Sequence, residues 1–203
     1  MNRLKISNNE GFSKDCLEAF NILKTNIEYY GKDCKVIAVT SCRDKEGKSL
    51  AALQVATGLA NDGYRVILLL ADFRKTMVNG DKTLNGFFEV INGEVSFEDV
   101  LYETDIIGMH MVFAGGSADN HNDKIDQVTY EKVMDSLKDR YDFVILDTST
   151  VGKNINDSTI YGKCDGAVLV METNKVAKKL ASHVINAIEQ TGCKVFGVVL
   201  NSK

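Results

Sequence analysis

Residues 36–49 decide the fold, and they read Val36-Ile-Ala-Val-Thr-Ser-Cys-Arg-Asp-Lys-Glu-Gly-Lys-Ser49. The stretch begins with a short apolar run, and the residues that follow Ser49, Leu-Ala-Ala-Leu-Gln-Val-Ala, favour a helix. The pattern predicts a strand, a tight loop and a helix that begins at Ser49. The first N–H groups of a helix have no partner within it and its end carries partial positive charge, so this loop can bind a phosphate.

The side chains at the end of the loop suit a nucleotide and its metal ion. Lys48 would reach the outer phosphates, and the Ser49 hydroxyl would ligate Mg²⁺. The Walker A pattern has a glycine six residues before this lysine, and Cys42 stands there instead. The alternative is an ordinary turn between a strand and a helix. Cys42 also lies just before a helix N-terminus, a position that can lower a thiol pKa.

The composition is that of an ordinary soluble protein. The chain has 203 residues, 44% of them hydrophobic, which is enough to bury a large core. A net charge of −4 argues against a nucleic-acid partner. Five scattered cysteines without a Cys-x-x-Cys pair indicate reduced thiols in a cytosol. No apolar run has the length of a signal-peptide core or a membrane-spanning helix, so we expect no direct membrane insertion.

Helical and strand patterns alternate along the rest of the chain. Apolar spacing predicts an N-terminal helix over 13–30 and a short helix from Ser96, which opens a capping box, through Tyr102. We further expect helices over 49–61, 128–138 and 176–190, and strands over 35–40, 65–70, 109–114, 141–146, 167–171 and 195–200. The alternation predicts an α/β fold, with a mainly parallel sheet and helices on both faces. We expect one domain over 1–203, with residues 1–12 flexible.

Acidic residues follow two of the expected strands. The strand over 65–70 leads into Ala71-Asp72-Phe73-Arg74, and the strand over 141–146 leads into Asp147. Ligands of such sheets bind beyond the carboxyl ends of the strands, where Asp147 could hold Mg²⁺ near the outer phosphates as a Walker B carboxylate does. Asp72 could hold Mg²⁺ too, or orient a nucleophile. The alternative is that both aspartates cap the turns that follow them.

Longer motifs carry a resemblance to a known family. They are Glu18-Ala-Phe-Asn-Ile-Leu-Lys-Thr-Asn-Ile27, Glu46-Gly-Lys-Ser49, Asp72-Phe-Arg74, Ser96-Phe-Glu-Asp-Val-Leu101, Ala114-Gly-Gly116, Asp147-Thr148, Asp165-Gly166 and Gly197-Val-Val-Leu-Asn201. Across nearly its whole length the chain resembles the bacterial tyrosine kinases (BY-kinases) of capsular and exopolysaccharide systems, of the CpsD/CapB type. These are relatives of the MinD/ParA ATPases, so the resemblance implies a phosphate-loop (P-loop) NTPase fold.

The resemblance also implies a site, a reaction and partners. Mg·ATP would be bound by Cys42, Arg43, Asp44, Lys45, Glu46, Gly47, Lys48, Ser49, Leu50 and Arg74. Lys48, Asp72 and Asp147 would be catalytic, and Ser49, Asp72 and Asp147 would ligate the metal. The family phosphorylates tyrosines in the C-terminal tail of a neighbouring subunit. The cytoplasmic segment of a transmembrane co-polymerase switches the kinase on, which implies a cytoplasmic chain at the inner face of the membrane and a homo-oligomer.

Several positions depart from the family pattern. Leu70 replaces the first aspartate of the family's Asp-x-Asp-x-Arg motif (Walker A′), and Asp44-Lys45 and Ser149-Thr150 replace Pro-Gly and Pro-Pro. The family's subunit-contact motif is reduced to Glu18, Asn21 and Lys24, and the seven tyrosines are dispersed, with no cluster at the C-terminus. We therefore expect an ATP-binding regulator of polysaccharide assembly, a pseudokinase with weak or lost autokinase activity. The alternatives are an active kinase that phosphorylates tyrosines in trans, and a MinD/ParA-like switch ATPase.

Overall fold

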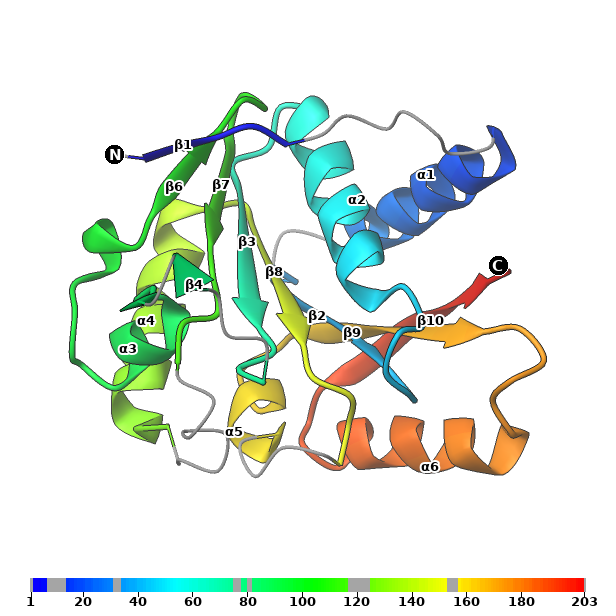
Figure 1. Cartoon of the computed structure of the whole chain (residues 1–203). Helices are drawn as coiled ribbons and strands as arrows, with labels where there is room; N and C mark the ends of the chain where they lie inside the picture. Colours follow the sequence, from blue (N-terminus) through cyan, green and yellow to red (C-terminus); the bar gives the residue numbers. More distant parts are fainter. Residues whose placement is uncertain are drawn as a thin grey trace.

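The computed structural model describes residues 2–6, 14–30, 34–74, 78–79, 82–116, 125–152 and 157–202. Its strands (Figure 1) are β1 (Asn2–Leu4), β2 (Val36–Ser41), β3 (Val66–Ala71), β4 (Val78–Asn79), β5 (Lys82–Thr83), β6 (Tyr102–Thr104), β7 (Met109–Val112), β8 (Phe143–Thr148), β9 (Gly166–Glu172) and β10 (Lys194–Asn201). Its helices are α1 (Lys14–Tyr29), α2 (Lys48–Asn61), α3 (Phe87–Ile91), α4 (Gln127–Arg140), α5 (Asp157–Tyr161) and α6 (Lys178–Glu189), with a 3₁₀ turn, η1 (Phe97–Asp99).

The main sheet has the strand order β1-β6-β7-β3-β8-β2-β9-β10. Every neighbouring pair in it is parallel except β6 and β7, so the prediction of a mainly parallel α/β sheet is confirmed. The order places β8 between β3 and β2, at the centre of the sheet. The chain moves from β2 across to β3, returns to β8 and then passes to β9 on the other side, which is the strand reversal beside which such sheets bind ligands.

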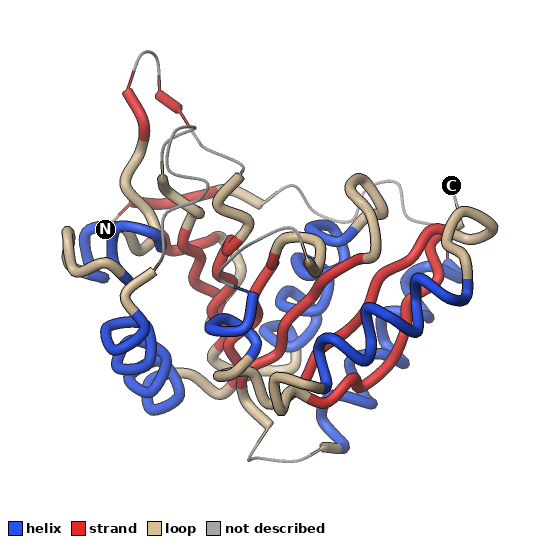
Figure 2. Tube along the Cα trace, turned by 90° about the horizontal axis from the view of Figure 1, so that it is seen from below, coloured by secondary structure: helices blue, strands red, loops and turns tan. Residues whose placement is uncertain are grey.

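Each face of the sheet is buried under helices, as Figures 1 and 2 show. Alternate residues of the central strands face opposite ways: Ile37 and Val39 of β2 pack with α1 and α2, whereas Val36 and Ala38 pack in the core that contains α3 to α6. Both sets are fully buried, which explains why the central strands read as unbroken apolar runs. Within the described residues, no helix is both long and apolar enough to cross a lipid bilayer.

Two local expectations are wrong. Residues 2–4, expected to be flexible with the rest of 1–12, form the edge strand β1 paired with β6, and the Ile6 N–H donates to the Asp105 carboxylate at 2.9 Å. The helix expected from Ser96 through Tyr102 is only the turn η1, because Tyr102 begins β6 and pairs there with β7. In both places pairing with a distant strand overrides the local signal. Residues 7–12 lie outside the described part of the chain.

Candidate functional site

The loop between β2 and α2 contains two residues in the left-handed region of backbone space. Gly47, the residue before α2, is in the left-handed region with a φ of 91°, and Lys45 has a φ of 66°. Glycine tolerates this region, but a lysine is strained there, so the departure at position 45 stores backbone strain in the loop. Gly47 supplies no side-chain cap, whereas the N-cap of α4, Asp126, accepts from Thr129 N at 2.6 Å. The start of α2 is thus not closed by a side chain of its N-cap residue.

The ends of β9 and β10 fix the shape of this loop. Asn201 donates from Nδ2 to the Glu46 carbonyl at 3.1 Å, and a Cβ at Gly47 would lie 2.7 Å from the same Nδ2. The buried Glu46 carboxylate accepts from the backbone N–H of Arg43 at 2.8 Å and of Glu172 at 3.4 Å. The sequence identified Glu46 as part of the loop but gave no role to Glu172 or Asn201, since their contacts depend on the strand order.

Lys48 is buried between the two acids that the sequence singled out. Its Nζ lies 2.9 Å from Asp147 Oδ1 and 3.5 Å from Asp72 Oδ2, and all three side chains are at most 7% exposed. Two strand ends that are far apart in sequence therefore converge on one ammonium group at the start of α2. Removing a carboxylate from water costs free energy unless a cation or hydrogen bonds compensate it. Desolvation of this cluster is therefore unfavourable, and its ion pairs offset that cost.

Arg74 extends the cluster toward solvent. Its guanidinium donates hydrogen bonds to both oxygens of Asp72, from Nε at 2.8 Å and from NH2 at 3.0 Å. NH2 also donates to Asp44 Oδ1 at 3.1 Å. The hydrogen bonds to Asp72 raise the pKa of Arg74, so it stays charged at any pH of interest. The buried Thr150 hydroxyl donates to Asp44 Oδ1 at 3.3 Å. Two positions that depart from the family pattern, 44 and 150, thus contact each other.

Leu70 lies beside Asp147 in the sheet. The register of β3 and β8 pairs the two residues, and strand alternation turns both side chains to the face that α1 and α2 cover. Leu70 is half-buried and packs against the hydrophobic core. An aspartate here would be a direct neighbour of Asp147, so the apolar residue removes one acid from the centre of the cluster.

The position of Cys42 before a helix does not lower the pKa of its thiol. Burial raises the pKa of the Cys42 thiol to about 11, the nearby Glu46 carboxylate adds to the shift, and Arg43 opposes it only in part. The thiol lies in the hydrophobic core at the end of β2, so desolvation outweighs the positive end of α2. Cys42 therefore occupies the first Walker A position as a packing residue.

The remaining loop positions surround the cluster. Asp44 and Lys45 are exposed, as are Arg43 and Leu50 at the two ends of the loop, and Ser49 is half-buried in the first turn of α2. In the described part of the chain, no three His, Cys, Asp or Glu side chains converge as a ready-made metal site. Mg²⁺ takes one or two carboxylates together with hydroxyl and phosphate oxygens, and Asp72, Asp147 and Ser49 offer such carboxylate and hydroxyl groups. The residues present fit a magnesium nucleotide.

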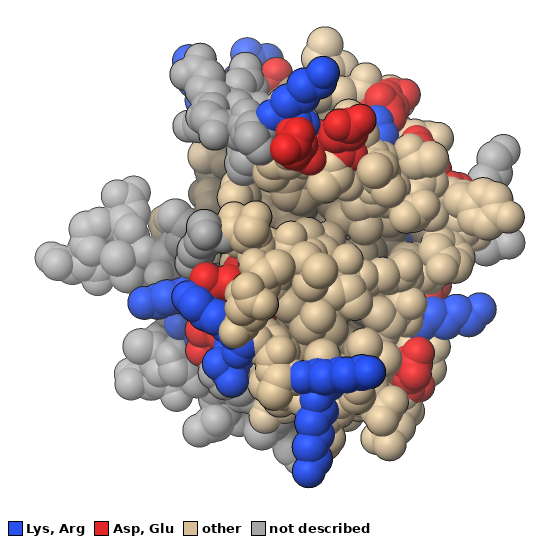
Figure 3. Space-filling view, turned by 90° about the vertical axis from the view of Figure 1, so that its right-hand side faces the viewer, with Lys and Arg blue, Asp and Glu red and all other residues tan. Residues whose placement is uncertain are grey.

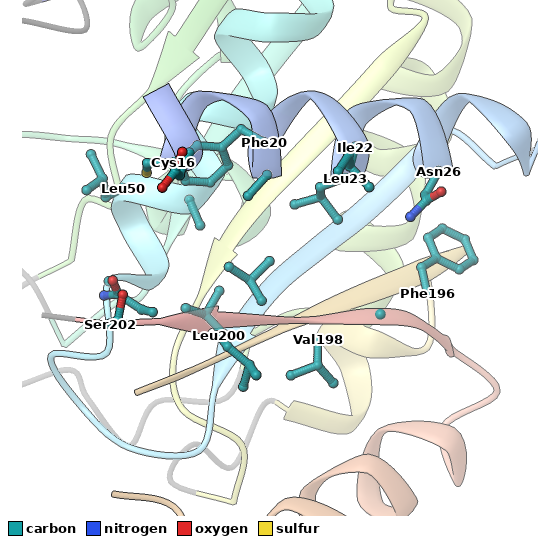
Figure 4. A pocket seen from close by; sticks show the side chains of 18 residues that line it. Cys16, Phe20, Ile22, Leu23, Asn26, Leu50, Phe196, Val198, Leu200 and Ser202 are labelled. Atoms are coloured by element: carbon teal, nitrogen blue, oxygen red, sulfur yellow. The ribbon is translucent and has the colours of Figure 1, made fainter. Parts of the chain in front are cut away.

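A groove of about 680 Å³ runs beside the loop, between α1, the start of α2 and the edge strand β10. Leu23 of α1 points from the helix toward β10 in Figure 4, whereas Val198 and Leu200 lie on the side of β10 that is turned away from α1. Figure 3 views the side of the molecule where β10 lies and shows few charged side chains at its centre. The sequence could not reveal this groove, because it exists only where β10 forms the edge of the sheet.

The fold and the loop together define the class, a P-loop α/β protein with its phosphate loop at the carboxyl edge of a parallel sheet. Residues 34–195 match the family model described as an AAA domain. The tyrosine-protein kinase CpsD of Streptococcus agalactiae is 30% identical over 193 residues, which are 93% of this chain and 84% of that protein. The chain therefore belongs to the bacterial tyrosine kinase family of the CpsD/CapB type, as its motifs indicated.

Solved structures agree with this assignment at the level of the fold. The chimerical protein CapA2B2 superposes with a TM-score of 0.82 at 23% identity, over 98% of this chain and 92% of that one. The septum site-determining protein MinD of Pyrococcus horikoshii, solved with Mg-ADP, has a TM-score of 0.66 at 24% identity, over 82% of this chain and 70% of that one. The P-loop fold related to MinD is confirmed.

Proposed function

We propose that this protein binds Mg·ATP and acts as a regulator of capsular or exopolysaccharide assembly, with weak or lost tyrosine autokinase activity. One observation carries the proposal: Lys48 is buried between Asp72 and Asp147 at the carboxyl edge of the sheet, beside the start of α2. A lysine and two carboxylates at that place suit a triphosphate and its Mg²⁺.

Each group of the cluster has a role in this proposal. The N–H groups at the start of α2 and Lys48 would hold the phosphates, and Ser49, Asp147 and Asp72 would ligate Mg²⁺, since both acids lie beside Lys48. Bound Mg²⁺ would neutralise the charge on the outer phosphates. The ammonium group of Lys48, now paired with two acids, would exchange one of them for phosphate oxygens.

Two observations support weak kinase activity. Leu70, which pairs with Asp147 in the sheet, carries no carboxylate that could accept the proton of a tyrosine hydroxyl. All seven tyrosines lie in the described residues, and three of them, Tyr130, Tyr141 and Tyr161, are buried. Tyr130 donates to the Ile160 carbonyl and the Tyr161 hydroxyl bonds Thr40, so neither hydroxyl can reach a neighbouring active site without unfolding.

The relatives' names support the setting and the partners. CpsD is named as a tyrosine-protein kinase, and CapA2B2 is a chimera of the kind expected when a kinase domain has a dedicated partner. We propose a cytoplasmic chain held at the inner face of the membrane by the cytoplasmic segment of a transmembrane co-polymerase. Glu18 and Asn21 are exposed on α1 for contacts between subunits, whereas Lys24 pairs within the chain with Asp62, the residue after α2.

Thermal unfolding with and without millimolar Mg·ATP tests the binding proposal. The wild-type protein should gain several degrees, and Lys48→Met should lose this gain entirely. The matched control is Lys138→Met, which removes an ion pair with Asp165 at 3.0 Å on another part of the chain and should keep the gain. A wild-type protein that shows no shift at millimolar Mg·ATP would refute the proposal.

One observation favours an active kinase as the second candidate. Tyr29, at the end of α1, is 90% exposed and could enter a neighbour's active site. Autophosphorylation with labelled ATP, followed by mapping of the modified residue, decides between the two. Label on Tyr29 that is lost in Tyr29→Phe would favour the kinase, and no label would favour the regulator. Dimers that form with ATP and dissociate on hydrolysis would favour the switch ATPase instead.

A further inference from the structure

The guanidinium of Arg74 forms ion pairs of unequal strength with two carboxylates. Asp72 accepts two hydrogen bonds from it in a fork, and its side chain is only 2% exposed. Asp44 accepts one, at 3.1 Å, and its side chain is 48% exposed. A bidentate, desolvated ion pair is much stronger than a single contact in solvent. Any new anion that reaches Arg74 will therefore displace Asp44 before it displaces Asp72.

The position of Arg74 indicates which anion this would be. Oδ2 of Asp72 lies 3.0 Å from Arg74 NH2 and 3.5 Å from Lys48 Nζ, so one carboxylate oxygen links the arginine to the lysine. In P-loop proteins this lysine reaches the outermost phosphates. Arg74 thus lies at the outer end of the phosphate site. A triphosphate extends to that end, and a diphosphate is one phosphate shorter.

We propose that Asp44 determines specificity between nucleoside tri- and diphosphates, by competing with the outermost phosphate for Arg74. The inference rests on the proposed function, since it requires that the loop bind nucleotide. A triphosphate must break the Asp44–Arg74 contact in order to recruit the guanidinium, whereas a diphosphate leaves that contact in place. Asp44 therefore penalises triphosphate binding selectively.

Thr150 makes this contact part of a bridge. Its buried hydroxyl donates to the oxygen of Asp44 that Arg74 contacts, so the phosphate loop is joined to the segment after β8 as well as to the segment after β3. Release of Asp44 from Arg74 would leave Thr150 as its remaining partner in this bridge. The two residues are 106 positions apart in the chain, and both depart from the family pattern described above.

Asp44→Asn tests the proposal in the full-length chain. Isothermal titration should show about fivefold tighter binding of a Mg-bound non-hydrolysable ATP analogue, the size expected for one partly exposed charge contact, and unchanged binding of Mg·ADP. Asp142→Asn is the matched control, because Asp142 also pairs with an arginine, Arg65, at 2.9 Å but lies at the amino end of β8. It should leave both affinities unchanged.

A double-mutant cycle separates competition for Arg74 from simple charge repulsion. In an Arg74→Gln background, Asp44→Asn should no longer alter the preference for triphosphate, because no guanidinium remains to be released. If the preference still rises there, Asp44 acts by repelling the phosphates and the proposal fails. The proposal also fails if Asp44→Asn tightens ADP and the ATP analogue equally, or tightens neither.

A third variant keeps the test decisive if Arg74→Gln does not fold. Thr150→Val keeps the shape of a buried residue but removes the hydroxyl that holds Asp44, so it should raise the triphosphate preference by a smaller factor than Asp44→Asn. An unchanged or lowered preference in Thr150→Val would count against the bridge. Wild-type protein that binds neither nucleotide would instead refute the proposed function itself, which keeps the two failures distinct.

Discussion

The two ends of the central strands both carry ion pairs, but they use them differently. At the carboxyl ends, Asp72 and Asp147 face a cationic side chain, Lys48, in a site that is almost closed to solvent. At the amino ends, Asp142 and Asp165 lie nearer to solvent, with side chains 37% and 22% exposed. Desolvation of these charges therefore costs more free energy at the carboxyl edge of the sheet than at the amino edge.

The acids at the amino ends also bind the backbone. Asp165 accepts from the N–H groups of Lys35 and Val36, at 2.9 and 2.8 Å, where β2 begins. Asp142 accepts from the Arg65 N–H at 2.8 Å, just before β3. These carboxylates satisfy strand ends that would otherwise lack partners, which is a structural task. The contrast teaches that acids at the two ends of the strands differ in their partners, which are backbone N–H groups at the amino ends and the Lys48 ammonium group at the carboxyl ends.

The largest expected effect comes from breaking the buried cluster. Lys48→Met leaves Asp147 buried without its cation, so we expect the free energy of unfolding to fall by about 3–5 kcal/mol. Lys138→Met, at the amino edge, should cost about 1 kcal/mol or less, because that pair is partly exposed. Urea unfolding measures both. Equal losses in the two variants would erase the distinction between the edges.

The two cysteines at the ends of β2 should differ strongly in reactivity. Cys34, half-buried before the strand, should react with iodoacetamide at pH 8 much faster than Cys42, whose raised pKa lowers its thiolate fraction about a hundredfold. Mass spectrometry of labelled peptides against time checks this. Because burial disfavours the thiolate in the folded chain, the stability that Cys42 contributes is complete below pH 9 and is lost as the pH rises to about 11. Equal rates at the two cysteines would contradict the assignment.

A new acid at position 70 should sharpen the contrast between the edges. Leu70→Asp places a carboxylate beside Asp147, so we expect a loss of about 2 kcal/mol in unfolding free energy at pH 7.5 that shrinks toward pH 5, as the added carboxyl group protonates. Mg·ATP should restore more stability to this variant than to the wild type. Leu70→Asn, which adds no charge, is the control.

Unfolding free energies measured at several pH values, and with and without Mg·ATP, test this prediction together. A loss that is the same for Leu70→Asp and Leu70→Asn, and independent of pH, would show that packing rather than charge sets the cost. A gain of autophosphorylation in Leu70→Asp would show in addition that the other groups of the site are competent.

The smallest expected effect is relief of backbone strain in the phosphate loop. Lys45 has a φ of 66°, so Lys45→Gly should raise the unfolding free energy by about 0.5–1 kcal/mol, after the entropy gained by the unfolded chain is deducted. Lys45→Ala removes the same charge without freeing the backbone and should bring no such gain. Urea unfolding of the pair measures the difference, and a gain in both variants would assign the effect to charge.

The elements that carry the site could be predicted locally. The unbroken apolar runs before Ser41 and Asp147 are long enough to mark buried strands, and the small and apolar residues after Ser49 mark a helix. The short strands β1 and β6 could not be predicted locally, because each has three residues and few apolar ones. They form only through pairing with other strands. The Ser96 capping signal failed for the same reason.

The sequence by itself determined the alternation of strands and helices, the phosphate loop and the acids at Asp72 and Asp147, because periodicity and strand length are local properties. Only the tertiary structure decided which side chains meet. The strand order sets Leu70 next to Asp147, and the folded chain brings Asp44 to Thr150 across 106 residues and Asn201 to Glu46 across 155. Such contacts follow from packing between distant segments, which no local pattern encodes.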